Sequence, residues 1–172
     1  RELLVEELDY SYIISAKYLH LASVTAVTRQ AAIWAKEKGV KVVFDADGFN
    51  PKILEMLPLI DVFIGSEFYY NGMFDDHNYE ANCLKIMERG PSIVVFTFGE
   101  RGCIGMDSDG FFIEPAFSVP VKDTTGAGDV YHGAFIYGLL HGWSTRDTAR
   151  FANAVAAIKC TRIGGRAGIP TL

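Results

Sequence analysis

The sequence predicts an α/β fold, with a mostly parallel sheet and helices on both faces, as a single domain over residues 1–172. Short apolar runs typical of buried strands alternate along the chain with longer segments that have helical periodicity. With 172 residues, 49% of them hydrophobic, the chain is long enough for one domain with its own core. No internal repeat, low-complexity segment or Ser/Pro linker divides it.

Charge and composition exclude several classes of partner. The net charge is −5 and there is no basic stretch, which argues against nucleic acid and against an anionic membrane surface. No apolar run reaches membrane-spanning length and no signal peptide is visible. Three cysteines lie far apart without a CxxC pair, so we expect reduced, buried thiols in a cytoplasmic protein.

The first half of the chain reads as alternating elements. Residues 1–8 have the period of a helix, and the apolar runs at 13–14 and 18–21 are of strand type. Further helices are expected over 23–38, 51–57 and 79–89, and further strands over 40–44, 61–65 and 92–97. Asp45-Ala46-Asp47-Gly48 follows a buried strand, where open α/β sheets bind ligands. A simple Asp/Gly turn explains these four residues equally well.

The second half begins with a predicted β-hairpin, with strands over 103–106 and 111–114 joined by Asp107-Ser108-Asp109-Gly110. An apolar helix rich in small residues follows over 130–140, and such a helix is expected to be buried. The last helix begins after Ser144 or Thr145 and runs through Ile158. A glycine-rich loop over 161–170 closes the sequence.

One stretch, Asp123-Thr124-Thr125-Gly126-Ala127-Gly128-Asp129, opens the apolar helix and carries the chemistry. Glycine allows a tight turn and a close approach of the backbone to a ligand. The N–H groups and the positive dipole end of a helix start attract an anion. The stretch therefore predicts a phosphate cradle with the carboxylate of Asp129 at its edge. The alternative is an ordinary N-cap at Asp123 or Thr124 with Asp129 as a first-turn match to the dipole.

Other glycine-rich nucleotide motifs do not fit. No lysine follows a glycine at the spacing of a Walker loop. Gly126 and Gly128 match the first two positions of a dinucleotide fingerprint, but Tyr131 takes the third. The GxSxG of serine hydrolases is absent.

The string DTTGAGD strongly resembles the second signature of the PfkB, or ribokinase-like, carbohydrate kinases. The resemblance covers the whole chain. Thr97–Gly102 is similar to the family's TxGxxG nucleotide turn, and Phe151–Ala154 to its last ATP-side helix. Thr161–Gly164 and Ile169-Pro170 are similar to the loop after that helix and to its usual close. The resemblance implies a ribokinase-like αβα sandwich and ATP-dependent phosphoryl transfer to a hydroxyl of a sugar.

Roles follow from the resemblance, residue by residue. Asp129 matches the base that takes the proton of the acceptor hydroxyl, and the backbone N–H groups of Gly126, Ala127 and Gly128 match an anion hole for the phosphoryl group. The residues that match the nucleotide-binding positions are Thr97, Gly99, Gly102 and Asn153. Magnesium would be carried on the ATP phosphates.

The resemblance also implies a site for a monovalent cation, with K⁺ as the candidate ion. Asp123, the backbone carbonyl of Thr125 and carbonyls of the 159–168 loop match the family's site for it. The implied partners are a small sugar and ATP, with no nucleic acid and no membrane.

Two departures from the family pattern leave alternatives open. Ser66 and Tyr69 stand where the family often has the Asn and Glu of an NxxE element that organises magnesium, and Glu67 is a candidate substitute. An inactive nucleotide-binding or regulatory module is therefore one alternative, and a nucleoside kinase is another.

Length is the second departure. The chain resembles the C-terminal portion of a PfkB-type kinase domain, so the resemblance places the lid, most sugar contacts and the first strands outside it. We expect the isolated chain to lack kinase activity and to expose a sheet edge. Self-association, as a homodimer, stays open.

Overall fold

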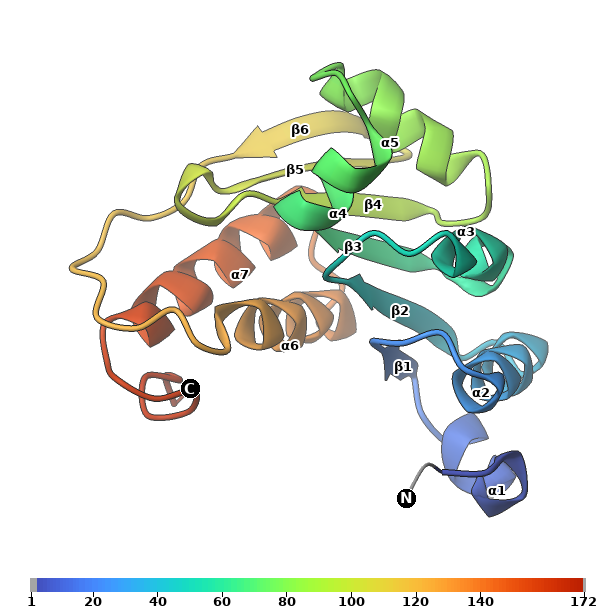
Figure 1. Cartoon of the computed structure of the whole chain (residues 1–172). Coiled ribbons are helices and arrows are strands. Elements are labelled where there is room, and N and C mark those ends of the chain that lie inside the picture. The colour runs from blue at the N-terminus through green and yellow to red at the C-terminus, as the bar shows by residue number, and fades with distance from the viewer. Residues whose placement is uncertain (1–2, 172) are drawn as a thin grey trace. The chain divides into compact units, whose positions relative to one another are not determined.

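The computed structural model describes residues 3–171, which form two compact units. The first unit comprises the residues up to Phe96 together with Met106–Asp109, and the second comprises Thr97–Gly105 and the residues from Gly110 onwards. The strand order follows the chain, β1-β2-β3-β4-β5-β6 (Figure 1), and β1, β2 and β3 pair in parallel. The predicted α/β class with a mostly parallel sheet is confirmed.

The first unit begins with two short helices. After the 3₁₀ turn η1 (Val5–Glu7), α1 spans Tyr10–Ile14, so the strand expected at residues 13–14 is wrong. The carboxylate of Asp9 caps α1 by accepting from the N–H of Tyr12 at 3.0 Å. A two-residue apolar run carries no periodicity, and the capping aspartate decides the local structure instead.

The next elements follow the prediction closely. They are β1 (Tyr18–Leu21), α2 (Ala26–Glu37), β2 (Lys41–Ala46), α3 (Lys52–Met56), the turn η2 (Leu57–Leu59) and β3 (Val62–Ser66). Thr25 caps α2 by accepting from the N–H of Thr28, whose hydroxyl accepts from the N–H of Thr25 in turn. Gly39 ends the helix with φ 77°, a conformation that favours glycine.

The remainder of the first unit holds its aromatic core. It contains α4 (Glu67–Met73), which the sequence did not predict, α5 (Tyr79–Met87) and β4 (Ile93–Thr97). The ring of Tyr69 packs against Phe63 of β3 and Phe96 of β4, with centroids 5.1 Å and 6.4 Å away. All three side chains are fully buried. Burial of large aromatic rings of this kind is the main stabilising contribution to a core.

The second unit consists of a hairpin and two long helices. Its elements are η3 (Gly99–Arg101), β5 (Cys103–Asp107, whose last two residues belong to the first unit), β6 (Gly110–Glu114), α6 (Ala127–Leu140) and α7 (Thr145–Cys160). Helices α6 and α7 lie side by side (Figure 1) and pack closely at Gly138. A Cβ atom on Gly138 would lie 2.7 Å from the hydroxyl oxygen of Thr148, so glycine allows this approach.

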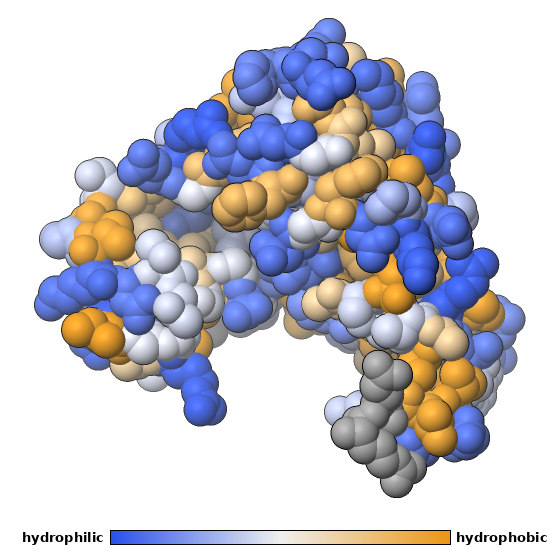
Figure 2. Space-filling model, viewed as in Figure 1, coloured by the Kyte–Doolittle hydropathy of each residue, from blue (hydrophilic) through white to orange (hydrophobic). Residues whose placement is uncertain are grey.

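Apolar side chains also reach the surface. Figure 2 shows hydrophobic residues among hydrophilic ones on the face in view. Leu3 and Leu4 are about half exposed. Between residues 3 and 171, no helix combines the length and apolar character needed to cross a membrane. Cys83, Cys103 and Cys160 are free and buried, as the sequence predicts.

Candidate functional site

The start of α6 places the central motif. Gly126 is the N-cap of the helix and has φ 75°, a left-handed conformation that L side chains rarely adopt. A Cβ atom there would lie 3.2 Å from the carbonyl oxygen of Gly165. Glycine therefore serves two purposes at this position. It turns the chain into the helix, and it lets the motif approach the C-terminal loop.

The motif exposes backbone donors beside a carboxylate. Across residues 3–171, no hydrogen bond from the protein occupies the amides of Gly126 and Gly128, whereas the amide of Ala127 donates to the carbonyl of Thr124 at 3.0 Å. Of the three amides predicted to form the anion hole, those of Gly126 and Gly128 are therefore open and that of Ala127 is used by a turn, and the anion hole itself stays a prediction. Asp129 is exposed in the first turn of α6. Its Oδ2 lies 3.7 Å from the position that a Cβ of Gly126 would take.

Asp123 holds the motif and the C-terminal loop together. Its Oδ1 accepts from the N–H of Thr125 at 2.9 Å, and its Oδ2 accepts from the N–H of Gly164 at 2.7 Å. These hydrogen bonds, that of the Thr125 backbone above all, lower the pKa of the Asp123 carboxyl to about 2. The carboxylate is thus a clamp between two segments 41 residues apart in sequence.

A buried lysine joins the same cluster, and sequence reasoning missed it. Lys159 lies in the last turn of α7, is fully buried, and donates from Nζ to the backbone carbonyl of Asp123 at 2.9 Å. The amides of Lys122 and Asp123 both donate to the carbonyl of Cys160. A signal existed in the sequence, because Lys159 is the one charged residue in the apolar run of residues 151–160.

A cavity of about 880 Å³ opens within the second unit. All four predicted nucleotide-binding residues line it, and so do two residues of the motif's helix start: Thr97, Gly99, Gly102, Asn153, Ala127 and Gly128. Much of the remaining lining is apolar, with Phe117, Val119, Tyr131 and Ala156 among it. Its size and mixed lining are typical of a small-molecule site. The structure therefore brings together the predicted nucleotide-binding residues, although Thr97 and Asn153 are 56 positions apart.

One wall of the cavity is the turn that contains η3. The amide of Phe98 donates to the carbonyl of Gly102 at 2.8 Å, and the amide of Gly102 donates to the carbonyl of Gly99 at 3.0 Å. Gly102 has φ 89°, and a Cβ atom there would lie 2.1 Å from the carbonyl oxygen of Glu114. The turn can therefore pack on the end of β6 only with glycine at this position.

Asn153 connects α7 to the end of β6. Its side-chain amide donates to the carbonyls of Glu114 and Pro115, each at 3.2 Å, and approaches the Sγ of Cys103 at 3.6 Å. The hydroxyl of Tyr131 also donates to Cys103 Sγ, at 3.4 Å. Burial raises the pKa of the Cys103 thiol to about 11, so the thiol is protonated and acts as a packing group. Asn153 thus shapes the cavity, and its amide nitrogen is already in use.

In the first unit, Ser66 and Tyr69 take structural roles. Ser66 caps α4 by accepting from the N–H of Tyr69 at 3.2 Å, and its hydroxyl donates to the carbonyl of Asp47. Tyr69 is fully buried among aromatic rings and its hydroxyl has no partner within residues 3–171. Burial raises the pKa of Tyr69 to about 12. At the position where the family often has glutamate, this chain therefore has a core residue.

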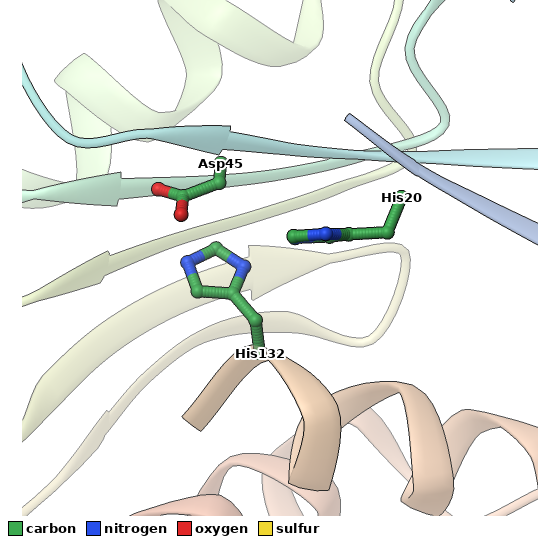
Figure 3. Close-up of side chains that lie close together, drawn as sticks. All are labelled: His20, Asp45 and His132. Carbon is green, nitrogen blue, oxygen red and sulfur yellow. The ribbon is translucent and has the colours of Figure 1, made fainter. Parts of the chain in front are cut away.

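The acidic stretch of residues 45–48, which was expected to follow a strand, begins within β2. Asp45 is half-buried and lies within β2, and His20 of β1 is exposed. His20 pairs in register with Val43, two residues before Asp45, so both side chains lie on the same face of the sheet. Figure 3 labels His20 and Asp45, which belong to the first unit, and His132, which belongs to α6 of the second unit. For residues 45–48, a simple Asp/Gly turn and a ligand-binding site both stay predictions.

Comparison with known proteins decides the family. The sequence family described as pfkB family carbohydrate kinase matches residues 1–172. The chain belongs to this family. A 5-dehydro-2-deoxygluconokinase of Clostridium beijerinckii is 30% identical over 181 residues, covering 91% of this pfkB chain and 53% of the relative.

Solved structures agree on the fold. The crystal structure of a ribokinase from Thermotoga maritima has a TM-score of 0.85 and 28% identity, and the match covers 99% of the pfkB chain and 59% of the ribokinase. An Arabidopsis thaliana ribokinase, solved with ribose and ATP, has a TM-score of 0.83 at 24% identity, covering 94% of this chain and 55% of that one. The ribokinase-like fold is confirmed. The pfkB chain spans about half the length of the curated relatives it matches.

Proposed function

We propose that this chain is the nucleotide-binding and catalytic-base portion of an ATP-dependent kinase that phosphorylates a hydroxyl of a sugar. The observation that carries the proposal is the cavity of the second unit, which gathers Thr97, Gly99, Gly102 and Asn153 at the start of α6. A family whose members phosphorylate carbohydrates supports the reaction class. The ribokinase neighbour solved with ribose and ATP supports the pair of ligands.

In this proposal, the apolar part of the cavity holds the base of ATP, and its phosphates extend toward the start of α6. The open amides of Gly126 and Gly128 stabilise the phosphoryl group in transfer, with the positive end of the helix dipole behind them. Phosphoryl transfer depends mainly on positioning and charge stabilisation, which backbone donors supply. Mg²⁺ would bind through the phosphates of ATP and a few oxygen ligands.

Asp129 is the proposed base that accepts the proton of the sugar hydroxyl. Its carboxylate is exposed next to the two open amides, and no ion pair within residues 3–171 engages it. A carboxylate close to an anion hole can take a proton from a hydroxyl while the hydroxyl oxygen attacks the phosphorus. A positioned base of this kind contributes about 10²–10⁴ in rate.

The second candidate is a nucleotide-binding module without transfer activity. The buried Tyr69 favours it, because an acid that organises magnesium is not available at that position. A nucleoside as acceptor is a further alternative within the enzyme class. Self-association of the protein as a homodimer stays a prediction.

The test uses the whole protein that carries this chain. ATP consumption with a panel of sugars and nucleosides should show acceptor-dependent release of ADP. Asp129→Asn should lower kcat by about 10²–10⁴ while the Kd for ATP changes by less than about threefold, because the base does not hold the nucleotide. Normal ATP affinity with no turnover on any acceptor would favour the inactive module.

Asp147→Asn is a matched control. Asp147 is the third residue of α7, as Asp129 is of α6, and it is also an exposed acid in a first helical turn. Both substitutions remove one charge from a helix N-terminus and cost similar dipole stabilisation. Equal losses of kcat in the two variants would refute Asp129 as the base.

A further inference from the structure

An ammonium group lies beside the residue that was expected to hold a monovalent ion. Lys159 is fully buried in the last turn of α7, and its Nζ is 2.9 Å from the backbone carbonyl oxygen of Asp123. Asp123 is the residue whose carboxylate matches the cation ligand of the family. The charge of Lys159 is therefore held on the backbone of a residue whose carboxylate would otherwise bind K⁺.

The three oxygens of Asp123 are already used by protein donors. The two carboxylate oxygens of Asp123 accept from the amides of Thr125 and Gly164, and its carbonyl accepts from Lys159. The loop closes tightly on the same place, since a Cβ on Gly168 would lie 2.1 Å from the carbonyl oxygen of Lys159. A dehydrated monovalent ion needs several oxygen ligands at once. Each oxygen of Asp123 thus has a protein donor, so this residue does not fit an added ion.

The electrostatic surroundings suit a cation that belongs to the protein. Lysine is almost never fully buried unless its charge is compensated. Here the C-terminal end of α7 contributes negative potential, and the carboxylate of Asp123 contributes a full negative charge. A single side chain thus brings the positive charge that this junction of loop and motif requires.

We propose that the Lys159 ammonium is a built-in cation that takes the place of K⁺ and holds the Asp123–Thr125 segment against the C-terminal loop. Lys159 acts as a positioning residue, because it does not itself line the cavity and its ammonium donates to the backbone of Asp123, next to the lining residue Thr124. It fixes the backbone just before Gly126, where the motif turns into α6. The consequence is that nucleotide binding by this chain does not depend on K⁺. The nucleotide part of the inference rests on the proposed function.

The first experiment needs no nucleotide. Thermal unfolding of the chain is measured in KCl, NaCl and tetramethylammonium chloride at equal ionic strength. A K⁺ site filled at 100 times its Kd would raise Tm by about 5 °C or more for a chain of this length. We expect Tm values that agree within about 1 °C. A rise in Tm specific to K⁺, saturating with concentration, would overturn the proposal.

The second experiment compares variants by calorimetric titration with ATP and Mg²⁺. Lys159→Met keeps the length of the side chain and removes its charge, and the loss of a charged hydrogen bond should weaken ATP binding by about tenfold or more. Lys159→Arg should keep the affinity within about threefold, because the charge remains. Lys122→Met is the matched control, since it removes an exposed lysine from the same segment and should have no effect.

The outcomes separate this inference from the proposed function. Absence of ATP binding in every salt would contradict the proposed function, and the unfolding series would still decide the inference. ATP binding that requires K⁺ in the wild-type chain would overturn the inference and leave the proposed function standing. If Lys159→Met does not fold, the cation series on the wild-type chain and the Lys159→Arg variant carry the test.

Discussion

The α-carbon of Gly102 is packed against the carbonyl oxygen of Glu114, and a Cβ atom on Gly102 would lie 2.1 Å from that oxygen. The contact joins the turn at the cavity wall to the end of β6. Neither partner can yield easily, because both are backbone atoms. The side chain of Glu114, itself buried, is fixed by an ion pair with Arg146 at 2.5 Å.

Gly102→Ala should therefore distort the cavity as well as destabilise the fold. The left-handed φ of 89° and the clash together should cost about 3 kcal/mol or more in the free energy of unfolding. Urea unfolding measures this loss, and titration with ATP should show weaker binding. Gly142→Ala is the control, because Gly142 has φ 70° and no atom of the described residues 3–171 lies within 4 Å of a new Cβ there. It should cost only about 1 kcal/mol.

Within residues 3–171, the hydroxyl of Tyr69 is buried without a partner, in contrast with that of its neighbour Tyr70. Tyr69→Phe should leave the free energy of unfolding unchanged or raise it by up to about 1 kcal/mol, because no hydrogen bond is lost. Tyr70 donates to the carbonyl of Asp76 at 3.1 Å and accepts from Asn82 at 2.8 Å. Tyr70→Phe should lower the free energy of unfolding by about 1–2 kcal/mol.

Urea unfolding of the two variants side by side is the measurement. Both variants lose a tyrosine hydroxyl from α4, so the difference between their free energies of unfolding measures the contribution of the hydrogen bonds of Tyr70. Two equal losses of stability would mean that Tyr69 has a partner that the structure does not reveal. Tyr69→Glu should prevent folding, since it would bury a carboxylate among Phe49, Phe63 and Phe96.

The sequence predicts this fold well where helix caps, turns and hydrophobic periodicity are clear. The capping box of Thr25 and Thr28 and the stop at Gly39 delimit α2, and the Asp107–Gly110 turn delimits the hairpin. Short elements escape this reasoning. Helix α4 has only seven residues, and its start depends on the cap formed by the Ser66 hydroxyl. Serine stabilises loops and turns in the same way, so the sequence does not distinguish this helix from a loop.

The sequence identifies which residues line the site, but it predicts their contacts and arrangement less well. The DTTGAGD string and the TxGxxG turn identify lining residues of one cavity, although they are far apart in the chain. The occupied amide of Ala127 and the burial of Lys159 depend on how the backbone of residues 122–126 lies against α7. Such tertiary contacts leave no local periodicity in the sequence.

Asp123 makes stability depend on pH in an acidic window. Hydrogen bonds from Thr125 and Gly164 lower its pKa from 3.8 to about 2 in the folded chain. A depressed carboxyl pKa contributes stability that is fully present above the unfolded value, near 3.9, and is lost as the pH falls toward 2. Asp123→Asn should therefore destabilise the chain at pH 6, and the difference from the wild type should shrink between about pH 4 and 2.

The measurement is the free energy of unfolding of both chains from pH 2 to 6. Asp75→Asn serves as the control, because Asp75 is exposed and lies outside the loop and the cavity. Its difference from the wild type should be small and flat with pH. If the Asp123→Asn difference stayed constant down to pH 2, the carboxylate would not be the clamp. The loss at pH 6 would then come from a changed shape of the 159–168 loop.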